Sequence, residues 1–120
     1  MLGDFSLFND FSKEQKKAFA KMDHSMLAFN KGENIIKEGE HDTSLYLLIR
    51  GSATVTKKGY GSSVALLTAG SVFGEISFLA RKPRQSHVIA NENILVIKMD
   101  DAYFAKLDST IQDKIHKYLI

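Results

Sequence analysis

The sequence has no cysteine among its 120 residues, which excludes disulfide bonds and thiolate metal ligands. It has no run close to the roughly 20 apolar residues that a membrane-spanning helix requires. Its first residues, 1–5, lack the basic and apolar regions of a secretory signal. The formal net charge of +2 is too small to indicate a nucleic-acid-binding surface. We therefore expect a cytoplasmic protein, in keeping with a reducing compartment, that binds neither nucleic acid nor membrane.

The usual signatures of catalysis and of metal binding are missing as well. The four histidines are scattered, with no His-x-His pair and no glutamate at ligand spacing: His24, His41, His87 and His116. There is no Gly-x-Ser-x-Gly segment of the kind that presents a nucleophilic serine. We expect no catalytic residue, no metal site and no enzymatic activity, and a metal-dependent jelly-roll enzyme is the least favoured interpretation.

Short β-type segments separated by turn residues dominate the middle of the chain. The expected strands are Ser25–Phe29, Asn34–Lys37, Ser44–Arg50, Ser52–Thr56, Ser62–Leu67, His87–Ala90 and Ile94–Lys98. Many short strands at such spacing favour a jelly-roll barrel, here about residues 25–99. With neither an internal repeat nor a linker, residues 1–120 are expected to form one domain.

Helices are expected on both sides of the barrel. Ser12–Gln15 has the pattern of a capping box, which predicts a helix to about Met22 with Ala18, Phe19 and Met22 on its buried side.

At the other end, residues 100–107 and 110–120 are expected to be helical, and Ser109–Gln112 has the pattern of a second capping box. Leu107, Ile111, Ile115 and Leu119 are four residues apart, so they form one apolar stripe. We expect this stripe to pack against the barrel, with a homodimer contact as the alternative.

The segment 73–79, Phe-Gly-Glu-Ile-Ser-Phe-Leu, carries the clearest functional signal, together with Pro-Arg-Gln-Ser at 83–86. Gly74 allows a close approach of the backbone to a ligand, and the amides that open the next helical turn attract anions. Arg84 supplies a forked, permanently charged donor for phosphate oxygens. Glu75 would repel a phosphate, but it can accept a hydrogen bond from a neighbouring ribose 2′-hydroxyl. The pattern therefore predicts a sugar phosphate site.

These residues resemble the phosphate-binding cassette of the cyclic nucleotide-binding domain family, which includes catabolite activator protein, the regulatory subunit of cyclic AMP-dependent protein kinase and cyclic nucleotide-gated channels. The run Lys37–Gly51 is similar to the early barrel of the family, and the likeness extends from about Phe8 to Leu119. The resemblance implies a mainly β jelly-roll barrel with an N-terminal helix, a short cassette helix and C-terminal helices. The two blocks in this order and at this spacing are a specific signal.

The resemblance also implies the ligand-binding residues: Phe73, Gly74, Glu75, Ile76, Ser77, Arg84, Gln85 and Ser86. Arg84 and cassette amides, that of Ser77 among them, would hold the cyclic phosphate. Ile76 is expected to pack into the barrel, and Ser86 is equally a phosphate neighbour or an ordinary strand residue. Gln85 departs from the family, which has alanine, serine or threonine there. Arg81 and Lys82 are taken as surface charges.

The implied function is that of a regulatory domain that binds a cyclic nucleotide and transmits the bound state through its C-terminal helices. Cyclic AMP is expected over cyclic GMP, because members selective for cyclic GMP often carry the threonine that Gln85 replaces. An effector domain or partner protein would lie outside these residues, and the short last helix would leave the base partly uncovered. The alternative is a degenerate fold that has lost nucleotide binding and serves as a protein-interaction module.

Overall fold

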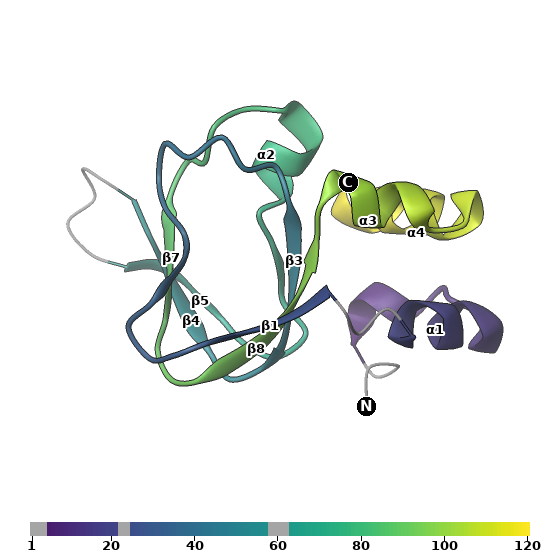
Figure 1. The fold of residues 1–120 in the computed structure, drawn as a ribbon, viewed down its shortest axis with the longest axis horizontal. Coiled ribbons are helices and arrows are strands. Elements are labelled where there is room, and N and C mark those ends of the chain that lie inside the picture. Colours follow the sequence, from purple (N-terminus) through teal and green to yellow (C-terminus); the bar gives the residue numbers. More distant parts are fainter. Residues whose placement is uncertain (1–4, 22–24, 58–62) are drawn as a thin grey trace.

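The computed structural model describes residues 5–21, 25–57 and 63–120, and it contains two four-stranded antiparallel sheets (Figure 1). One sheet has the order β1-β8-β3-β6 and the other β2-β7-β4-β5. The strands are β1 Met26–Phe29, β2 Asn34–Ile36, β3 Leu45–Arg50, β4 Ala53–Thr56, β5 Ser63–Leu67, β6 Val72–Phe73, β7 His87–Ala90 and β8 Ile94–Met99. The mainly β architecture with flanking helices is confirmed. Closure into a jelly-roll barrel is not shown, because the described strands pair within two separate sheets.

Each expected strand is present: β7 has the expected bounds, and each of the others differs by one residue at one end, with Ser62 outside the described residues. The sequence analysis missed β6, a two-residue strand that pairs Phe73 with Tyr46 and Val72 with Leu47. Two residues are too few to show an alternating pattern, so only their partners in β3 define this strand. Phe73, the first residue of the cassette, therefore belongs to the sheet and lies shortly before α2.

The central strand β3 is buried on both of its faces. Leu45 and Leu47 belong to a core cluster shared with the helices, whereas Tyr46 and Leu48 belong to a cluster between the two sheets. This alternation follows from the two-residue period of a strand. The β1-β8-β3-β6 sheet therefore separates the helical part of the molecule from the interior between the sheets.

The first helices are η2 Ser6–Phe8 and α1 Lys13–Ala20. The expected capping box is confirmed: the Gln15 amide donates to Ser12 Oγ at 3.1 Å, and the Ser12 amide donates to Gln15 Oε1 at 2.9 Å. The expected buried stripe is only partly correct, because Phe19 is buried but Ala18 is exposed. Met22 lies outside the described residues.

The remaining helices are α2 Glu75–Ala80, α3 Asp101–Lys106 and α4 Ser109–Leu119. The capping box predicted at Ser109 is wrong: Asp108 is the N-cap, and its carboxylate accepts a hydrogen bond from the Thr110 hydroxyl. Gln112, expected to close that box, instead donates from Nε2 to the carbonyls of Phe104 and Leu107, at 2.9 Å each. The Gln112 side chain thus supplies hydrogen-bond donors to backbone carbonyls at the end of α3.

The apolar stripe of the C-terminal segment packs as expected in the core that the helices share with β3 and β8, with Leu107, Ile111 and Ile115 buried and Leu119 partly buried. None of the helices in the described ranges is long and apolar enough to span a membrane.

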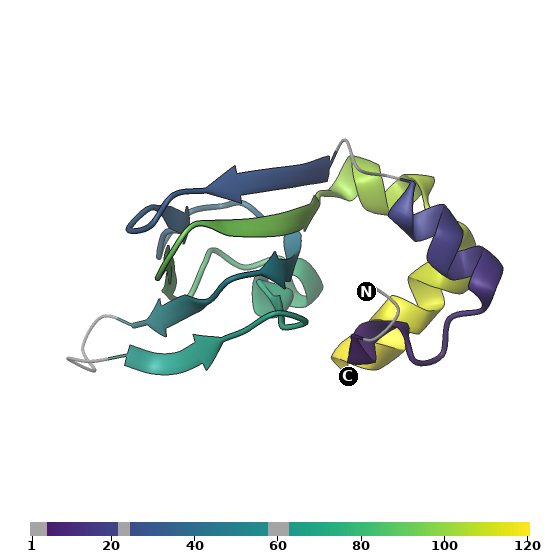
Figure 2. The same cartoon turned by 90° about the horizontal axis from the view of Figure 1, so that it is seen from below.

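The N-terminal helices pack against α3 and α4 at one end of the sheets (Figure 2). Gln15 of α1 donates to Thr110 Oγ1 at 3.1 Å and accepts from Lys114 Nζ at 2.6 Å. The hydroxyls of Ser6 and Tyr118 are 2.7 Å apart, and the Phe19 and Tyr103 rings meet edge to face at 6.1 Å. The first and last segments of the described chain are therefore joined directly.

Candidate nucleotide site

The cassette helix α2 begins at a glycine that no other residue can replace without strain. Gly74 is the N-cap of α2 with φ of +83°, in the left-handed region. A Cβ atom there would lie 2.9 Å from Arg84 Nη1 and 2.9 Å from the Ser44 carbonyl oxygen. The predicted special role of Gly74 thus has two causes, its backbone conformation and the approach of the Arg84 guanidinium.

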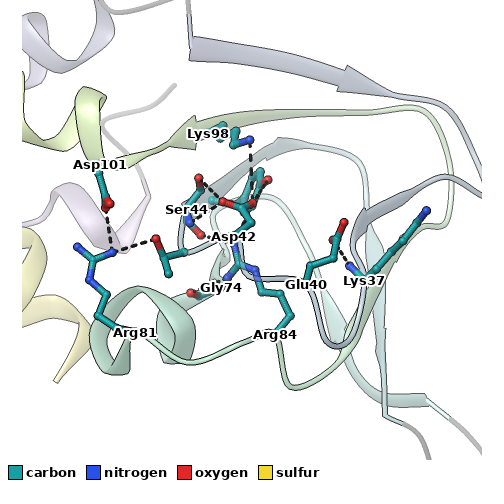
Figure 3. A network of polar contacts seen from close by, with 11 residues as sticks. Lys37, Glu40, Asp42, Ser44, Gly74, Arg81, Arg84, Lys98 and Asp101 are labelled. Carbon is teal, nitrogen blue, oxygen red and sulfur yellow. Dashed lines mark hydrogen bonds and ion pairs between the residues drawn. The ribbon is translucent and has the colours of Figure 1, made fainter.

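Arg84 is almost completely enclosed, with 3% of its surface exposed. Its Nη2 donates to the Ser44 carbonyl at 2.6 Å, and its Nη1 donates to the Gly74 carbonyl at 3.1 Å (Figure 3). Its backbone is fixed as well, since the amide of Arg84 donates to the Glu40 carbonyl at 2.7 Å and its carbonyl accepts from the Gly39 amide at 2.8 Å. The side chain is held in place by the protein alone.

The Arg84 Nε atom is buried and has no protein hydrogen-bond partner. An unsatisfied donor on a buried guanidinium is unfavourable by about 1–3 kcal/mol or more unless an acceptor meets it. Because Arg84 also lines the pocket described below, the arrangement suits an anionic ligand.

Asp42 belongs to the same network, and the sequence analysis missed it. Its carboxylate accepts from the Ser44 amide at 3.0 Å, from Ser44 Oγ at 2.7 Å and from Arg84 Nη2 at 3.3 Å, and Lys98 Nζ lies 4.0 Å away (Figure 3). Burial by itself would raise the pKa of Asp42, but the Ser44 hydrogen bonds and the charges of Lys98 and Arg84 outweigh it and lower the pKa. Asp42 therefore stays ionised beside Arg84.

The Asp-x-Ser spacing could have indicated the local contact of Asp42 with Ser44. The contact with Arg84, 42 residues away, leaves no such signal in the sequence.

Tyr46 adds a third hydroxyl or amide donor to Asp42, with its OH 3.3 Å from Asp42 Oδ2. Burial, and after it the neighbouring Asp42, raises the pKa of Tyr46, so the phenol remains a neutral donor.

A pocket of about 340 Å³ opens between the cassette and the β2-β7-β4-β5 sheet, within the usual size range of small-molecule sites. All the residues predicted to bind a ligand line it: Phe73, Gly74, Glu75, Ile76, Ser77, Arg84, Gln85 and Ser86. The sequence analysis missed the opposite wall, formed by Ile36, Val55, Lys57, Ala65, Leu67 and Val88, and it also missed Val72 of β6, beside the cassette. The pocket thus has a polar cassette on one side and, apart from Lys57, an apolar wall on the other.

The cassette residues differ in how they meet this pocket. Glu75 is half-buried at the first position of α2, and Ser77 is buried. The prediction that Ile76 packs into the barrel is wrong, since it is 53% exposed. The buried face of the short helix is taken by Ser77 and Phe78, which leaves Ile76 at the edge of the pocket.

The two residues after Arg84 lie where the pocket meets β7. Gln85 is exposed, and its Nε2 donates to the Pro83 carbonyl at 3.0 Å, so the side chain folds back on its own loop. Ser86 is half-buried directly before His87, the first residue of β7.

Arg81 is more than the surface charge it was taken for. It ends α2 in the left-handed region with φ of +57°, and its Nη1 donates to Thr43 Oγ1 at 2.9 Å and to Asp101 Oδ1 at 3.0 Å (Figure 3). Asp101 is the first residue of α3. Arg81 therefore connects the cassette helix to the C-terminal helices, while Lys82 is exposed as expected.

Aromatic rings make a second connection between the same elements. Phe78 of α2 meets Phe104 of α3 at 5.1 Å, and the His116 ring of α4 lies 5.1 Å from Phe104 and 6.1 Å from Phe78. His116 thus has an aromatic environment, and no cluster of three or more potential metal ligands occurs among the described residues. His24 lies outside them.

The C-terminal helices do not contribute to the lining of the pocket. None of the described residues that line the pocket belongs to α3 or α4. Tyr118 of α4 contacts Ser6 at the N-terminal side instead.

Comparison with known proteins agrees with this geometry. The family model for the cyclic nucleotide-binding domain matches residues 26–110. The cAMP-dependent protein kinase regulatory subunit of Debaryomyces hansenii is 32% identical over 110 residues, which cover 84% of this chain and 24% of the relative. That of Yarrowia lipolytica is 37% identical over 84 residues, 70% of this chain and 22% of the relative. The chain thus spans about a quarter of the length of these relatives.

A solved structure described as Sp-2Cl-cAMPS bound to PKAR CBD2 is similar to this fold as a whole. Its TM-score is 0.77 at 29% sequence identity, and the match covers 97% of this chain and 77% of the solved chain. The likeness therefore includes the helices as well as the sheets.

Proposed function

Because the chain belongs to the cyclic nucleotide-binding domain family, we propose that it binds a cyclic nucleotide in the pocket between the cassette and the β2-β7-β4-β5 sheet, and that it acts as a regulatory domain. The observation that carries the proposal is Arg84, a buried arginine that lines this pocket and has an unpartnered Nε. Its function is recognition rather than reaction.

The phosphate is held by Arg84 and by backbone amides of the cassette, that of Ser77 among them. A charge-assisted hydrogen bond of this kind contributes about 1.5–3 kcal/mol. Gly74, Phe73 and Ser86 line the same side of the pocket and shape the space for the phosphate. Glu75 accepts a hydrogen bond from the ribose 2′-hydroxyl, and Ile76 and the apolar wall flank the sugar and base.

Cyclic AMP is the preferred ligand. Gln85 occupies the position where a threonine hydroxyl would favour guanine, and its amide is turned to the Pro83 carbonyl. The relatives from Debaryomyces hansenii and Yarrowia lipolytica are both named for their dependence on cAMP.

The bound state is transmitted through the contacts of α2 with α3 and α4. A ligand that draws the cassette inward also moves Arg81, and with it Asp101 of α3. It moves Phe78 as well, which contacts the rings of Phe104 and His116. Ligand binding therefore shifts the equilibrium between two positions of the C-terminal helices. The effector domain or partner protein that responds to the bound state lies outside these residues, and the names of the relatives point to a protein kinase as that partner.

The base remains partly open to solvent in the isolated chain, because no described residue of α3 or α4 lines the pocket. A partner, or residues outside this chain, completes the cover. Removing α4 would be a poor test, because Ile111 and Ile115 are core residues. Tyr118→Ala is the better variant: unchanged affinity for cyclic AMP supports the open base, and a large loss would assign Tyr118 as the cover.

The alternative function is that of a protein-interaction module without nucleotide binding, favoured by the long side chain of Gln85 at the pocket lining. Calorimetric titration with cyclic AMP and cyclic GMP separates the two functions, with the non-cyclic 5′-AMP as the ligand control. Saturable binding of a cyclic nucleotide, with 5′-AMP much weaker, supports the proposal. Failure of both cyclic nucleotides to bind the folded protein leaves the interaction module.

A further inference from the structure

The turn Lys37–Glu40 holds the backbone of Arg84, the residue on which the proposed binding of a phosphate depends. The Arg84 amide donates to the Glu40 carbonyl at 2.7 Å, and the Gly39 amide donates to the Arg84 carbonyl at 2.8 Å. These two hydrogen bonds fix both peptide groups of Arg84 to the turn. A shift of the turn would therefore shift Arg84 as well.

The turn is closed by two hydrogen bonds of its own and is tied to strand β7 by a third. The Glu40 amide donates to the Lys37 carbonyl at 3.2 Å, and the Lys37 amide donates to Glu40 Oε1 at 2.9 Å (Figure 3). The amide of Glu38 donates instead to Nδ1 of His87 at 3.2 Å. His87 is the first residue of β7, so its ring holds the turn from the strand that follows the cassette loop.

The contact between Glu38 and His87 requires an unprotonated nitrogen. A histidine nitrogen accepts a hydrogen bond only while it carries no hydrogen, so the ring must be neutral with its hydrogen on Nε2. A proton added at Nδ1 turns the acceptor into a second donor that faces the Glu38 amide, and the hydrogen bond is lost. Histidine is the side chain that ordinarily gains this proton between about pH 8 and pH 5.

Charged side chains also surround the ring, but they act differently from this hydrogen bond. Carboxylates attract a protonated ring and cationic groups repel it, whereas only the hydrogen bond acts on the backbone of the turn. The charged residues nearest to the ring along the chain, in the turn and beside the β4 residue that pairs with His87 are Lys37, Glu38, Glu40, Lys57 and Arg84.

His87 acts from outside the pocket. It is not among the described residues that line the pocket, whereas Ser86 before it and Val88 after it are. Successive side chains of a strand point to opposite faces of the sheet, so the His87 ring lies on the face away from the ligand. A charge on the ring is thus remote from the phosphate, and we expect its attraction for the phosphate to be weaker than the effect of the lost hydrogen bond.

We propose that His87 is a positioning residue whose neutral ring holds the turn Lys37–Glu40 against Arg84, so that the affinity for a cyclic nucleotide falls when the ring is protonated. The effect is read through ligand affinity, so it rests on the proposed function and deepens it with a second signal, the proton. The coupling is reciprocal: a bound nucleotide favours the neutral ring by the same factor.

The test is a calorimetric titration of the chain with cyclic AMP from about pH 8 to about pH 5.5, a range in which ordinary carboxylates stay ionised. We expect wild type to lose about threefold to tenfold in affinity as the pH falls, the range for one hydrogen bond. His87→Asn offers an oxygen acceptor that does not titrate, so it should bind like wild type at the upper pH and keep that affinity at the lower. His87→Leu has no acceptor and should bind more weakly than wild type at the upper pH, with a flat profile.

The matched control is His41→Asn. His41 is an exposed histidine that directly follows the turn, and it is not among the described residues that line the pocket. This variant should keep the pH dependence of wild type. Thermal unfolding of each variant at both ends of the pH range confirms that it is folded.

A second measurement needs no ligand. In a two-dimensional NMR spectrum of the ligand-free chain, the amide resonances of Glu38, Gly39 and Arg84 should shift with the same midpoint as the His87 ring, because one proton displaces the whole turn. In His87→Asn these shifts should be absent. A ring that only fills space would leave the three amides unmoved.

A wild-type affinity that stays constant over the whole pH range would overturn the proposed role of His87, and so would a His87→Asn variant with the full pH dependence. Amides of the turn that do not follow the ring would overturn it as well. If folded wild type binds no cyclic nucleotide at any pH, the proposed function itself fails, and the effect on affinity fails with it. The amide shifts then decide separately whether His87 controls the turn.

Discussion

Replacing Arg84 with leucine should weaken both the fold and the binding of a cyclic nucleotide, because the same guanidinium serves both. In the protein alone it donates to the Ser44 and Gly74 carbonyls and pairs with Asp42. Leucine can replace none of these bonds. The two carbonyls lose a buried partner, and the carboxylate loses a nearby positive charge.

The magnitude follows from these contacts. An unsatisfied buried polar group is unfavourable by about 1–3 kcal/mol, and this penalty applies to the Ser44 carbonyl, whereas the Gly74 carbonyl keeps the hydrogen bond from the Phe78 amide. A chain of 120 residues has a total stability of about 6–18 kcal/mol. Arg84→Leu is thus expected to be substantially destabilised, and its nucleotide affinity is expected to fall by about ten- to hundredfold or more through loss of the phosphate partner.

The two effects are separated by measuring them independently. Urea unfolding gives the free energy of unfolding, and calorimetric titration with cyclic AMP under conditions where the variant is folded gives its affinity. Arg84→Lys keeps the positive charge but lacks the planar set of guanidinium donors. It should therefore lose affinity, with a smaller loss of stability than Arg84→Leu. Arg50→Leu is the matched control, because Arg50 is exposed at the end of β3 and does not line the pocket.

Either of two results would contradict these roles of Arg84. If Arg84→Leu is as stable as Arg50→Leu, the buried contacts of Arg84 do not support the fold. If folded Arg84 variants bind cyclic AMP like wild type, Arg84 is not the phosphate partner.

Three more predictions concern the neighbours of Arg84. If Glu75 accepts a hydrogen bond from the ribose 2′-hydroxyl, 2′-deoxy-cyclic AMP should bind wild type much more weakly than cyclic AMP does. Glu75→Gln should bind the two ligands with nearly equal affinity. Purely additive losses of affinity in this cycle would mean that Glu75 is only a carboxylate at the helix end. The pKa of Asp42 is lowered in the folded protein, so its stabilising contribution is present above its ordinary pKa of 3.8 and is lost as the pH falls through the lower folded value. Asp42→Asn should therefore unfold more easily in urea at neutral pH, with a shallower loss of stability toward acid, and an unaltered acid profile would contradict this. Gly74→Ala should lower the free energy of unfolding by about 1–3 kcal/mol through its positive φ alone, and a thermal melt equal to that of wild type would show that the loop relaxes freely.

The parts of the fold and site that the sequence predicted are those with local causes. Turn residues and short β-type runs located most strands, and the Ser12 capping box formed as expected because both partners lie within one helical turn. The order and spacing of the cassette residues along the chain are themselves the signal, and these residues line one pocket, while their contacts with a ligand stay a prediction.

The errors have causes that the local pattern does not contain. The capping-box pattern at Ser109 does not form a capping box, because Asp108 is the N-cap and the Gln112 side chain donates to a carbonyl at the end of α3. Ile76 was misplaced because six residues of α2 are too few to reveal which face is buried. The ion pair of Asp42 with Arg84 depends on long-range packing, so it could be seen only in three dimensions.

The hydrogen bonds between the two ends of the chain have a practical consequence for anyone who wishes to watch this domain respond to its ligand. Ser6 of η2 is hydrogen-bonded to Tyr118, and Gln15 of α1 to Thr110 and Lys114, so we expect these N-terminal helices to move together with α4 (Figure 2). A pair of fluorophores on α1 and α4 would therefore keep nearly the same separation, and its energy transfer would not report the proposed movement of the C-terminal helices. One dye on α4 and the other at Leu66, an exposed residue of the edge strand β5, would instead span the boundary across which we propose that movement takes place.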